Sequence, residues 1–182
     1  MNLWLKLMSI LVMAGGTMQT LSGQQKAHIV VPASRAMPMA TTLSAISASP
    51  GTISFTATDP DLGSDAGSSS ATVSWSTSGG SAAGTWNLKV NAAAASFTNC
   101  ATVPRSAIKV TCGGVTGGSA GSCGGAVTLS GASQQVASGK ESASNGASYS
   151  VTLNFTLADS WSYIAKQSPS CTLSLTYTVT AP

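Results

Sequence analysis

The chain has 182 residues, of which only 7% are charged, and its formal net charge is +3. Soluble domains carry about 25% charged residues, and this chain contains no run of basic residues, so nucleic acids and anionic membranes are excluded as expected partners. The length beyond a short leader suggests one domain with a sizeable core.

The N-terminus has the layout of a secretory signal peptide. Lys6 supplies one positive charge, and residues 7–16 form an apolar run that gives way to polar residues. This order of charge, short apolar run and polar segment is typical of export signals. The run is too short to span a bilayer, which needs about 20 apolar residues. We therefore expect a secreted or cell-surface protein with no membrane span after cleavage of the signal.

The predicted cleavage site sets the boundary between the signal peptide and the rest of the chain. Thr20 and Ser22 place small residues at the two recognition positions, and residues 25–27 (Gln-Lys-Ala) offer a weaker alternative. We assign residues 1–23 to the signal peptide and residues 24–48 to an extended N-terminal arm. The folded domain is predicted to cover residues 49–182.

Alternating apolar and polar residues predict strands along that domain. The two clearest runs come last and place hydroxyl side chains opposite apolar ones, as expected for antiparallel sheets with one solvated face. Runs 71–77 and 85–90 are interpreted as one hairpin, and the Gly-rich stretch 113–125 as a loop. In chain order the predicted strands cover residues 51–58, 71–77, 85–90, 106–112, 126–130, 149–157 and 171–179. The pattern predicts an all-β protein, an antiparallel β-sandwich of immunoglobulin-like or jelly-roll kind.

The chain contains four cysteines, all beyond the predicted signal peptide. An even count in an exported chain predicts two disulfides, and four cysteines allow three pairings. We favour Cys112 with Cys123, which would close the Gly-rich loop, and therefore Cys100 with Cys171. A zinc site is disfavoured because no two cysteines have the close spacing of a zinc motif.

The residue types needed for catalysis are scarce. His28 is the only histidine and lies in the N-terminal region, and Glu141 is the only glutamate and lies in a Ser/Gly-rich segment. A nucleophilic triad needs a base, and a glycosidase needs two carboxylates across a cleft. We therefore predict a protein that is not an enzyme and uses no cofactor. The loop carrying Asp59, Asp61 and Asp65 is a weak Ca²⁺ candidate, and a solvated connecting loop is the favoured interpretation.

Tryptophan and tyrosine provide the candidate binding residues. Trp75 and Trp86 share the phase of the apolar residues in their strands, so both are expected in the core. Trp161 and Tyr163 lie in a connection between the two clearest strands and are the candidate binding residues for a sugar or a protein. The alternative, which we favour for this pair, is an aromatic plug over one end of the sandwich.

Two parts of the chain resemble known families. Gly84-Thr85-Trp86-Asn87-Leu88-Lys89-Val90, followed by the segment 103–110, resembles secreted bacterial surface proteins of the WxL-domain type. Strands 149–157 and 171–182 resemble the C-terminal parts of pilin-like and spore-coat-protein-U-like sandwiches. This chain lacks a second Trp-x-Leu near its C-terminus and carries four cysteines, which departs from the WxL pattern. The resemblance implies a structural or adhesive role at the bacterial envelope.

The expected function is that of a non-enzymatic, secreted or cell-surface structural or adhesion protein. One alternative is a carbohydrate-binding module that uses Trp161 and Tyr163. Another is a pilin-like self-assembling subunit, in which the segment 27–40 completes a neighbour's sandwich by strand addition. The expected partner is accordingly a cell-wall glycan, another protein or a second copy of the chain.

Overall fold

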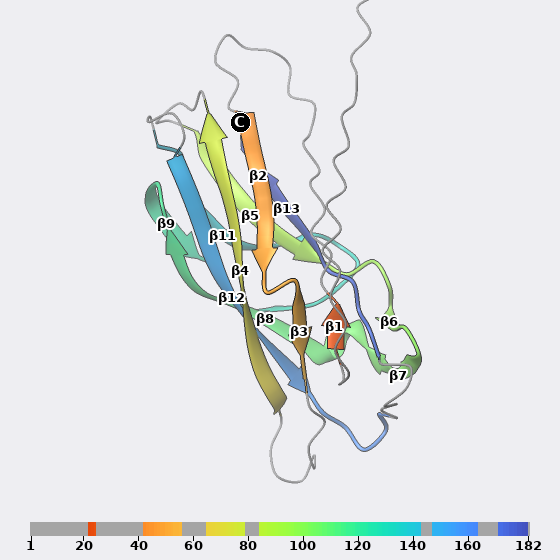
Figure 1. The fold of residues 1–182 in the computed structure, drawn as a ribbon. Coiled ribbons are helices and arrows are strands. Elements are labelled where there is room, and N and C mark those ends of the chain that lie inside the picture. The colour runs from red at the N-terminus through yellow and green to blue at the C-terminus, as the bar shows by residue number, and fades with distance from the viewer. Residues whose placement is uncertain are drawn as a thin grey trace, which may run out of the picture.

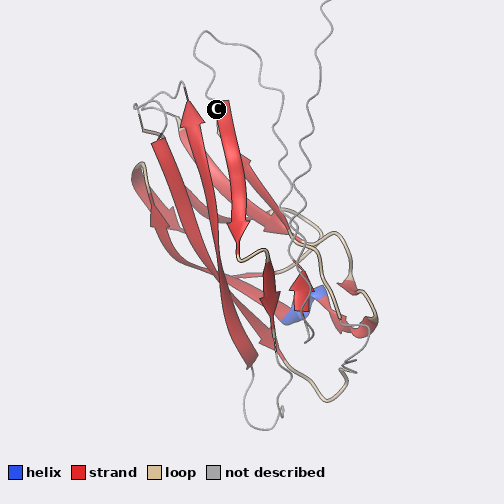
Figure 2. Ribbon diagram, in the orientation of Figure 1, coloured by secondary structure: helices blue, strands red, loops and turns tan. Residues whose placement is uncertain are grey.

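The computed structural model describes residues 22–24, 42–55, 65–78, 84–142, 147–163 and 171–181. Two antiparallel sheets pack face to face, which confirms the prediction of an all-β, disulfide-bonded fold with a sandwich-like arrangement (Figures 1 and 2). The five-stranded sheet has the order β10-β8-β12-β4-β2, and the four-stranded sheet has the order β13-β5-β11-β9. Among these residues, no helix is long and apolar enough to cross a membrane.

The five-stranded sheet consists of β2 (Thr42–Ser49), β4 (Asp65–Ser78), β8 (Ile108–Thr116), β10 (Val127–Thr128) and β12 (Ala147–Ala158). The four-stranded sheet consists of β5 (Thr85–Asn91), β9 (Ser119–Cys123), β11 (Gln134–Lys140) and β13 (Thr176–Thr180). Two small pairs complete the fold: β1 (Ser22–Gln24) with β3 (Thr52–Ser54), and β6 (Ser96–Phe97) with β7 (Cys100–Pro104). A 3₁₀ turn at Arg105–Ala107 leads into β8.

The core lies between the two sheets and follows the predicted alternation. β12 runs between β4 and β8, and its inward side chains are Tyr149, Val151, Leu153, Phe155 and Leu157, all at most 3% exposed. Every second residue of a strand points to the same face. The even-numbered residues of β12 therefore point outward, and most of them carry hydroxyl groups.

The predicted hairpin of runs 71–77 and 85–90 is wrong. β4 pairs with β2 and β12, whereas β5 pairs with β11 and β13, so the two runs belong to different sheets. Their inward faces meet across the core, where the rings of Trp75 and Trp86 lie 5.1 Å apart. Alternation determines which face of a strand is buried, but it does not determine which strand lies beside it.

The Gly-rich stretch 113–125 is not one loop. It contains the end of β8, the two-residue turn Gly117–Gly118 and the whole of β9. Both turn glycines have positive φ, at 84° and 68°, a conformation that glycine adopts without steric cost. A Cβ at Gly117 would also overlap the carbonyl oxygen of Ser148. The glycines therefore serve a tight turn packed on β12.

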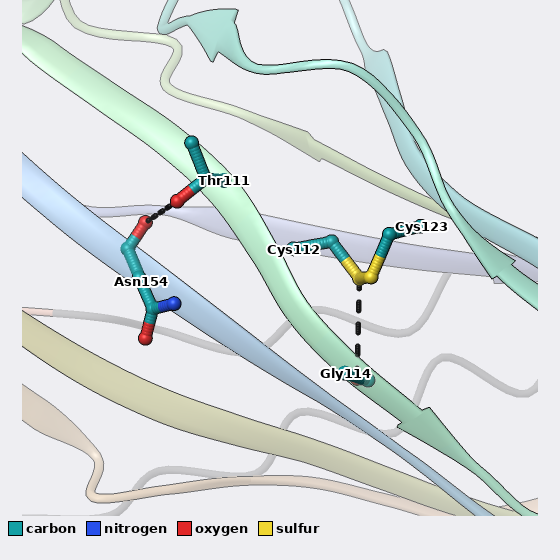
Figure 3. Close-up of a disulfide and its surroundings, with 5 residues drawn as sticks. All are labelled: Thr111, Cys112, Gly114, Cys123 and Asn154. Atoms are coloured by element: carbon teal, nitrogen blue, oxygen red, sulfur yellow. Dashed lines mark hydrogen bonds between the residues drawn. A yellow bond between two sulfur atoms is a disulfide. The ribbon is translucent and has the colours of Figure 1, made fainter.

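Both disulfides form with the favoured pairing, Cys100–Cys171 and Cys112–Cys123, with Cα–Cα distances of 5.3 and 5.2 Å. Cys112 lies on β8 and Cys123 on β9, so this bond connects one strand of each sheet (Figure 3). Cys100 and Cys171 are buried and connect β7 to the extended segment that precedes β13.

The N-terminal part of the fold begins earlier than residue 49, where the sequence placed the start of the domain. β2 pairs with β4 in the five-stranded sheet and therefore belongs to the sandwich. β1 pairs antiparallel with β3, with Ser22 opposite Ser54 and Gln24 opposite Thr52. The N-terminal segment thus reaches the folded domain at the β3 edge.

Candidate contact sites

A tight turn follows β12 and presents Trp161. The amide of Tyr163 donates to the carbonyl oxygen of Ser160 at 2.9 Å, which closes a four-residue turn. The amide of Ser162 donates to the hydroxyl of Ser160 at 3.3 Å, and the two serine hydroxyls lie 3.0 Å apart. The amide of Ser160 donates in turn to Oδ1 of Asp159 at 2.8 Å. This network of short-range bonds fixes the backbone on both sides of the indole.

The structure separates the two predicted binding residues. Trp161 is 70% exposed and is the one large hydrophobic side chain exposed among the residues that the structure describes. Tyr163 is half-buried and packs against the core. The favoured interpretation of an aromatic plug is therefore wrong for Trp161 and correct in part for Tyr163. An exposed indole on a hydrogen-bonded turn offers a flat apolar surface with neighbouring hydroxyls for contact with a partner.

The outer face of the five-stranded sheet holds a second candidate surface. A shallow depression of about 330 Å³ lies over β4, β8 and β12. Trp75 and Tyr149 also border this depression. Their own side chains are buried in the core, whereas the residues on either side of them in the strand point outward. The hydroxyl-bearing residues that line it are Ser74, Ser76, Thr116, Ser148 and Ser150.

These hydroxyls come into register because the strands pair directly. Ser150 lies opposite both Ser74 and Thr116, and the hydroxyl oxygens of Ser150 and Thr116 lie 2.5 Å apart. The depression can therefore form hydrogen bonds with a neutral polar ligand, while its walls bring no charge. The alternation in the sequence predicts outward hydroxyl groups on β4 and β12. Which of these hydroxyls lie side by side depends on the order of the strands in the sheet.

The acidic loop and the scarce titratable residues give no metal-binding arrangement in the described part of the chain. Asp59, Asp61 and His28 lie outside the described residues, and Asp65 is the first residue of β4, opposite Ala158. No group of three His, Cys, Asp or Glu side chains comes together within the described ranges. Glu141, which the sequence placed in a loop, follows β11 directly and is only 1% exposed.

Trp75 and Trp86 lie in the core, as predicted. The ring of Trp75 stacks on Tyr149 at 5.6 Å, and the ring of Trp86 meets Tyr149 edge-on at 6.0 Å. The hydroxyl of Tyr149 accepts a hydrogen bond from the amide of Ser142 at 2.8 Å. These aromatic rings are structural and are not available as a binding platform.

An apolar crevice lies at the opposite end of the core from these rings. Its volume is about 10 Å³, which is at the lower limit for one water molecule. β3 forms one wall and the segment preceding β13 forms another. The lining residues are Ile53, Phe55, Phe97, Ile108, Leu129, Phe155, Leu173 and Leu175. Sequence alternation identified several of these residues as core but gave no sign of the small crevice between them.

Comparison with protein families, with characterised proteins and with solved structures finds no match to this chain. The candidate sites therefore stand on their own geometry. Trp161 can make apolar and stacking contacts, and the outer depression can exchange hydrogen bonds.

Proposed function

We propose that this chain is a non-enzymatic β-sandwich, secreted or held at the cell surface, that acts as a structural or adhesion module of the bacterial envelope. The observation that carries the proposal is the exposure of Trp161 on a turn fixed by hydrogen bonds. The predicted signal peptide and the two disulfides support an oxidising, extracytoplasmic location. The resemblance of the Trp86 segment to secreted surface proteins supports the same role.

Tryptophan at such a position is suited to contact with a partner. It buries a large rigid surface at little cost in side-chain entropy, and it is enriched among the residues that dominate binding energies. The hydroxyls of Ser160 and Ser162 beside it complement a neutral polar surface such as a cell-wall glycan. The low charge of the chain agrees with a neutral partner.

Sedimentation with washed bacterial envelopes tests this proposal. The oxidised mature protein is expected to pellet with envelopes, and Trp161→Ala is expected to weaken retention by about 30-fold, which corresponds to about 2 kcal/mol for a dominant contact residue. The unfolding free energy should change by no more than about 0.5 kcal/mol, because the side chain is exposed.

Gln135→Ala, at an exposed position on β11, is the matched control and should bind like the wild type. Retention of Trp161→Ala at the wild-type level would remove Trp161 from the contact. A second variant, Ser150→Lys, places a charge in the outer depression. If that variant alone loses binding, the contact surface is the sheet face.

A second candidate function is self-assembly by strand addition, as in a pilin-like subunit. The observation that favours it is the pairing of β3 with a short strand from the N-terminal segment. Unpaired strand edges accept further strands through backbone hydrogen bonds. Deleting residues 27–40 should leave monomers in sedimentation velocity, and polymers that survive the deletion would contradict this function.

A further inference from the structure

The short strand β1 coincides with the predicted end of the signal peptide. β1 covers Ser22–Gln24, while the predicted cleavage follows Ser22 or lies a few residues downstream. Cleavage directly after Ser22 would leave two of the three residues of β1, and removal of the assigned signal peptide, residues 1–23, would leave one. Cleavage at the alternative site would remove the whole strand.

β1 lies on the edge of β3. The register places Gly23 opposite Ile53, one of the residues that line the apolar crevice. Within the described residues β3 has no other ladder partner. Loss of β1 therefore leaves the backbone groups of β3 without their partner strand, next to the small apolar crevice of the core.

The opposite wall of the crevice is also short of partners. Leu173 and Leu175 are buried, and within the described residues their segment forms a single isolated bridge, between Thr172 and Thr98, rather than a ladder. The ladder of the four-stranded sheet resumes only at β13. The region around β3 is thus the part of the sandwich where an extended segment can add both backbone hydrogen bonds and apolar cover.

We propose that β1 is a removable cover strand: the uncleaved chain closes the β3 edge with its own leader, and export cleavage uncovers that edge for pairing with a second copy of the chain. The inference rests on the self-assembly function proposed above and adds the step that determines when assembly begins. A precursor with a covered edge stays monomeric, and only the processed protein associates. The cleavage that ends export is then also the step that permits assembly.

The occupant that fits the uncovered edge is the N-terminal arm of a second copy. The cut leaves each chain with a new N-terminus only a short distance in sequence from the position that β1 occupied. The chain has few charges and a formal net charge of only +3, so two copies repel each other weakly. An N-terminal segment of this same chain already pairs with β3 in antiparallel register.

The test compares one protein before and after cleavage. The full chain is purified in a mild detergent, its size is measured by sedimentation velocity, and signal peptidase is then added in the same detergent. N-terminal sequencing establishes the cut. We expect a monomer before cleavage and concentration-dependent oligomers afterwards. An uncleaved chain that assembles as well as the processed one, or a cut upstream of Ser22, would overturn the inference.

A pair of lysine variants locates the interface. Ser54→Lys places a charge at an exposed position on the β3 edge, and Asn154→Lys places the same charge at an exposed position on β12, in the middle of the sheet. The processed Ser54→Lys protein should remain monomeric, whereas processed Asn154→Lys should assemble.

Assembly of both variants would place the interface elsewhere and overturn the assignment to β3. A wild-type protein that stays monomeric after cleavage would overturn self-assembly itself, and the envelope-binding experiment would remain a separate test of adhesion.

Discussion

The two ends of the core are built differently. At one end Trp75, Trp86 and Tyr149 interlock between the sheets, with ring centroids 5.1 to 6.0 Å apart. They project from β4, β5 and β12, three long strands that are paired on both sides. At the other end lies the apolar crevice, beside the three-residue strand β3 and the two-residue strand β6.

The difference shows that apolar burial and backbone pairing need not go together. The side chains at the crevice end are as deeply buried as those at the aromatic end, with Ile53 at 2% and Leu173 at 2% exposure. The segments that carry them have few ladder hydrogen bonds. Local opening should therefore require less free energy at the crevice end than at the aromatic end.

Shortening one buried side chain at each end of the core tests that comparison. These substitutions are expected to have the largest effect on the unfolding free energy. Trp86→Ala removes one of the three interlocking rings of the aromatic end and should lower the unfolding free energy by about 4 kcal/mol. Leu173→Ala should cost about 2 kcal/mol, because its surroundings are short, weakly paired segments that can relax toward the cavity. Urea unfolding followed by circular dichroism measures both. Equal costs would contradict the proposed difference between the ends.

Removal of either disulfide, by replacing both of its cysteines, should lower the unfolding free energy almost as much. Cys100 and Cys171 are 71 residues apart in sequence and Cys112 and Cys123 are 11 apart. By the loop-entropy relation, Cys100→Ala/Cys171→Ala should lose about 4 kcal/mol of unfolding free energy and Cys112→Ala/Cys123→Ala about 3 kcal/mol.

Native-state hydrogen exchange extends the disulfide experiment. The loss of Cys100–Cys171 should raise exchange first around β6 and β7, at the crevice end. Faster exchange at the aromatic end instead would show that the two ends open as one unit.

Alanine substitutions at two separate glycines are predicted to have the smallest effect on stability. Gly139 lies opposite Trp86 on the neighbouring strand, and a Cβ there would come within 2.5 Å of the indole ring. Gly139→Ala should therefore cost about 2 kcal/mol through overpacking. Gly125→Ala is the control, because a Cβ at that position would meet no atom within 4 Å apart from those of its two chain neighbours. Thermal unfolding of the two variants should show a lower midpoint only for Gly139→Ala.

The sequence was most informative where a strand alternates without interruption. The inward residues of β12, the buried Trp75 and Trp86, and the disulfide pairing were predicted because each depends on local pattern or on cysteine spacing. β11 was not predicted. Its buried neighbours Val136 and Ala137 break the alternation at a register shift between Gln135 and Ala137.

The candidate sites were less predictable for the same reason. Trp161 was identified as a binding residue, but its exposure depends on the direction of a four-residue turn, which composition does not specify. The depression over Ser74, Ser150 and Thr116 depends on strand order, and strand order depends on contacts between residues far apart in the sequence. Periodicity carries no information about such contacts.

The Cys100–Cys171 bond also sets how this chain responds to mechanical tension. A pull on the two ends of the oxidised protein passes from Cys100 to Cys171 through the sulfur atoms and bypasses the residues between them. Those residues would span about 250 Å if fully extended. In the oxidised protein the residues between the two cysteines carry no tension and stay folded. Reduction of the disulfide puts these residues under tension, so the reduced chain can extend much further.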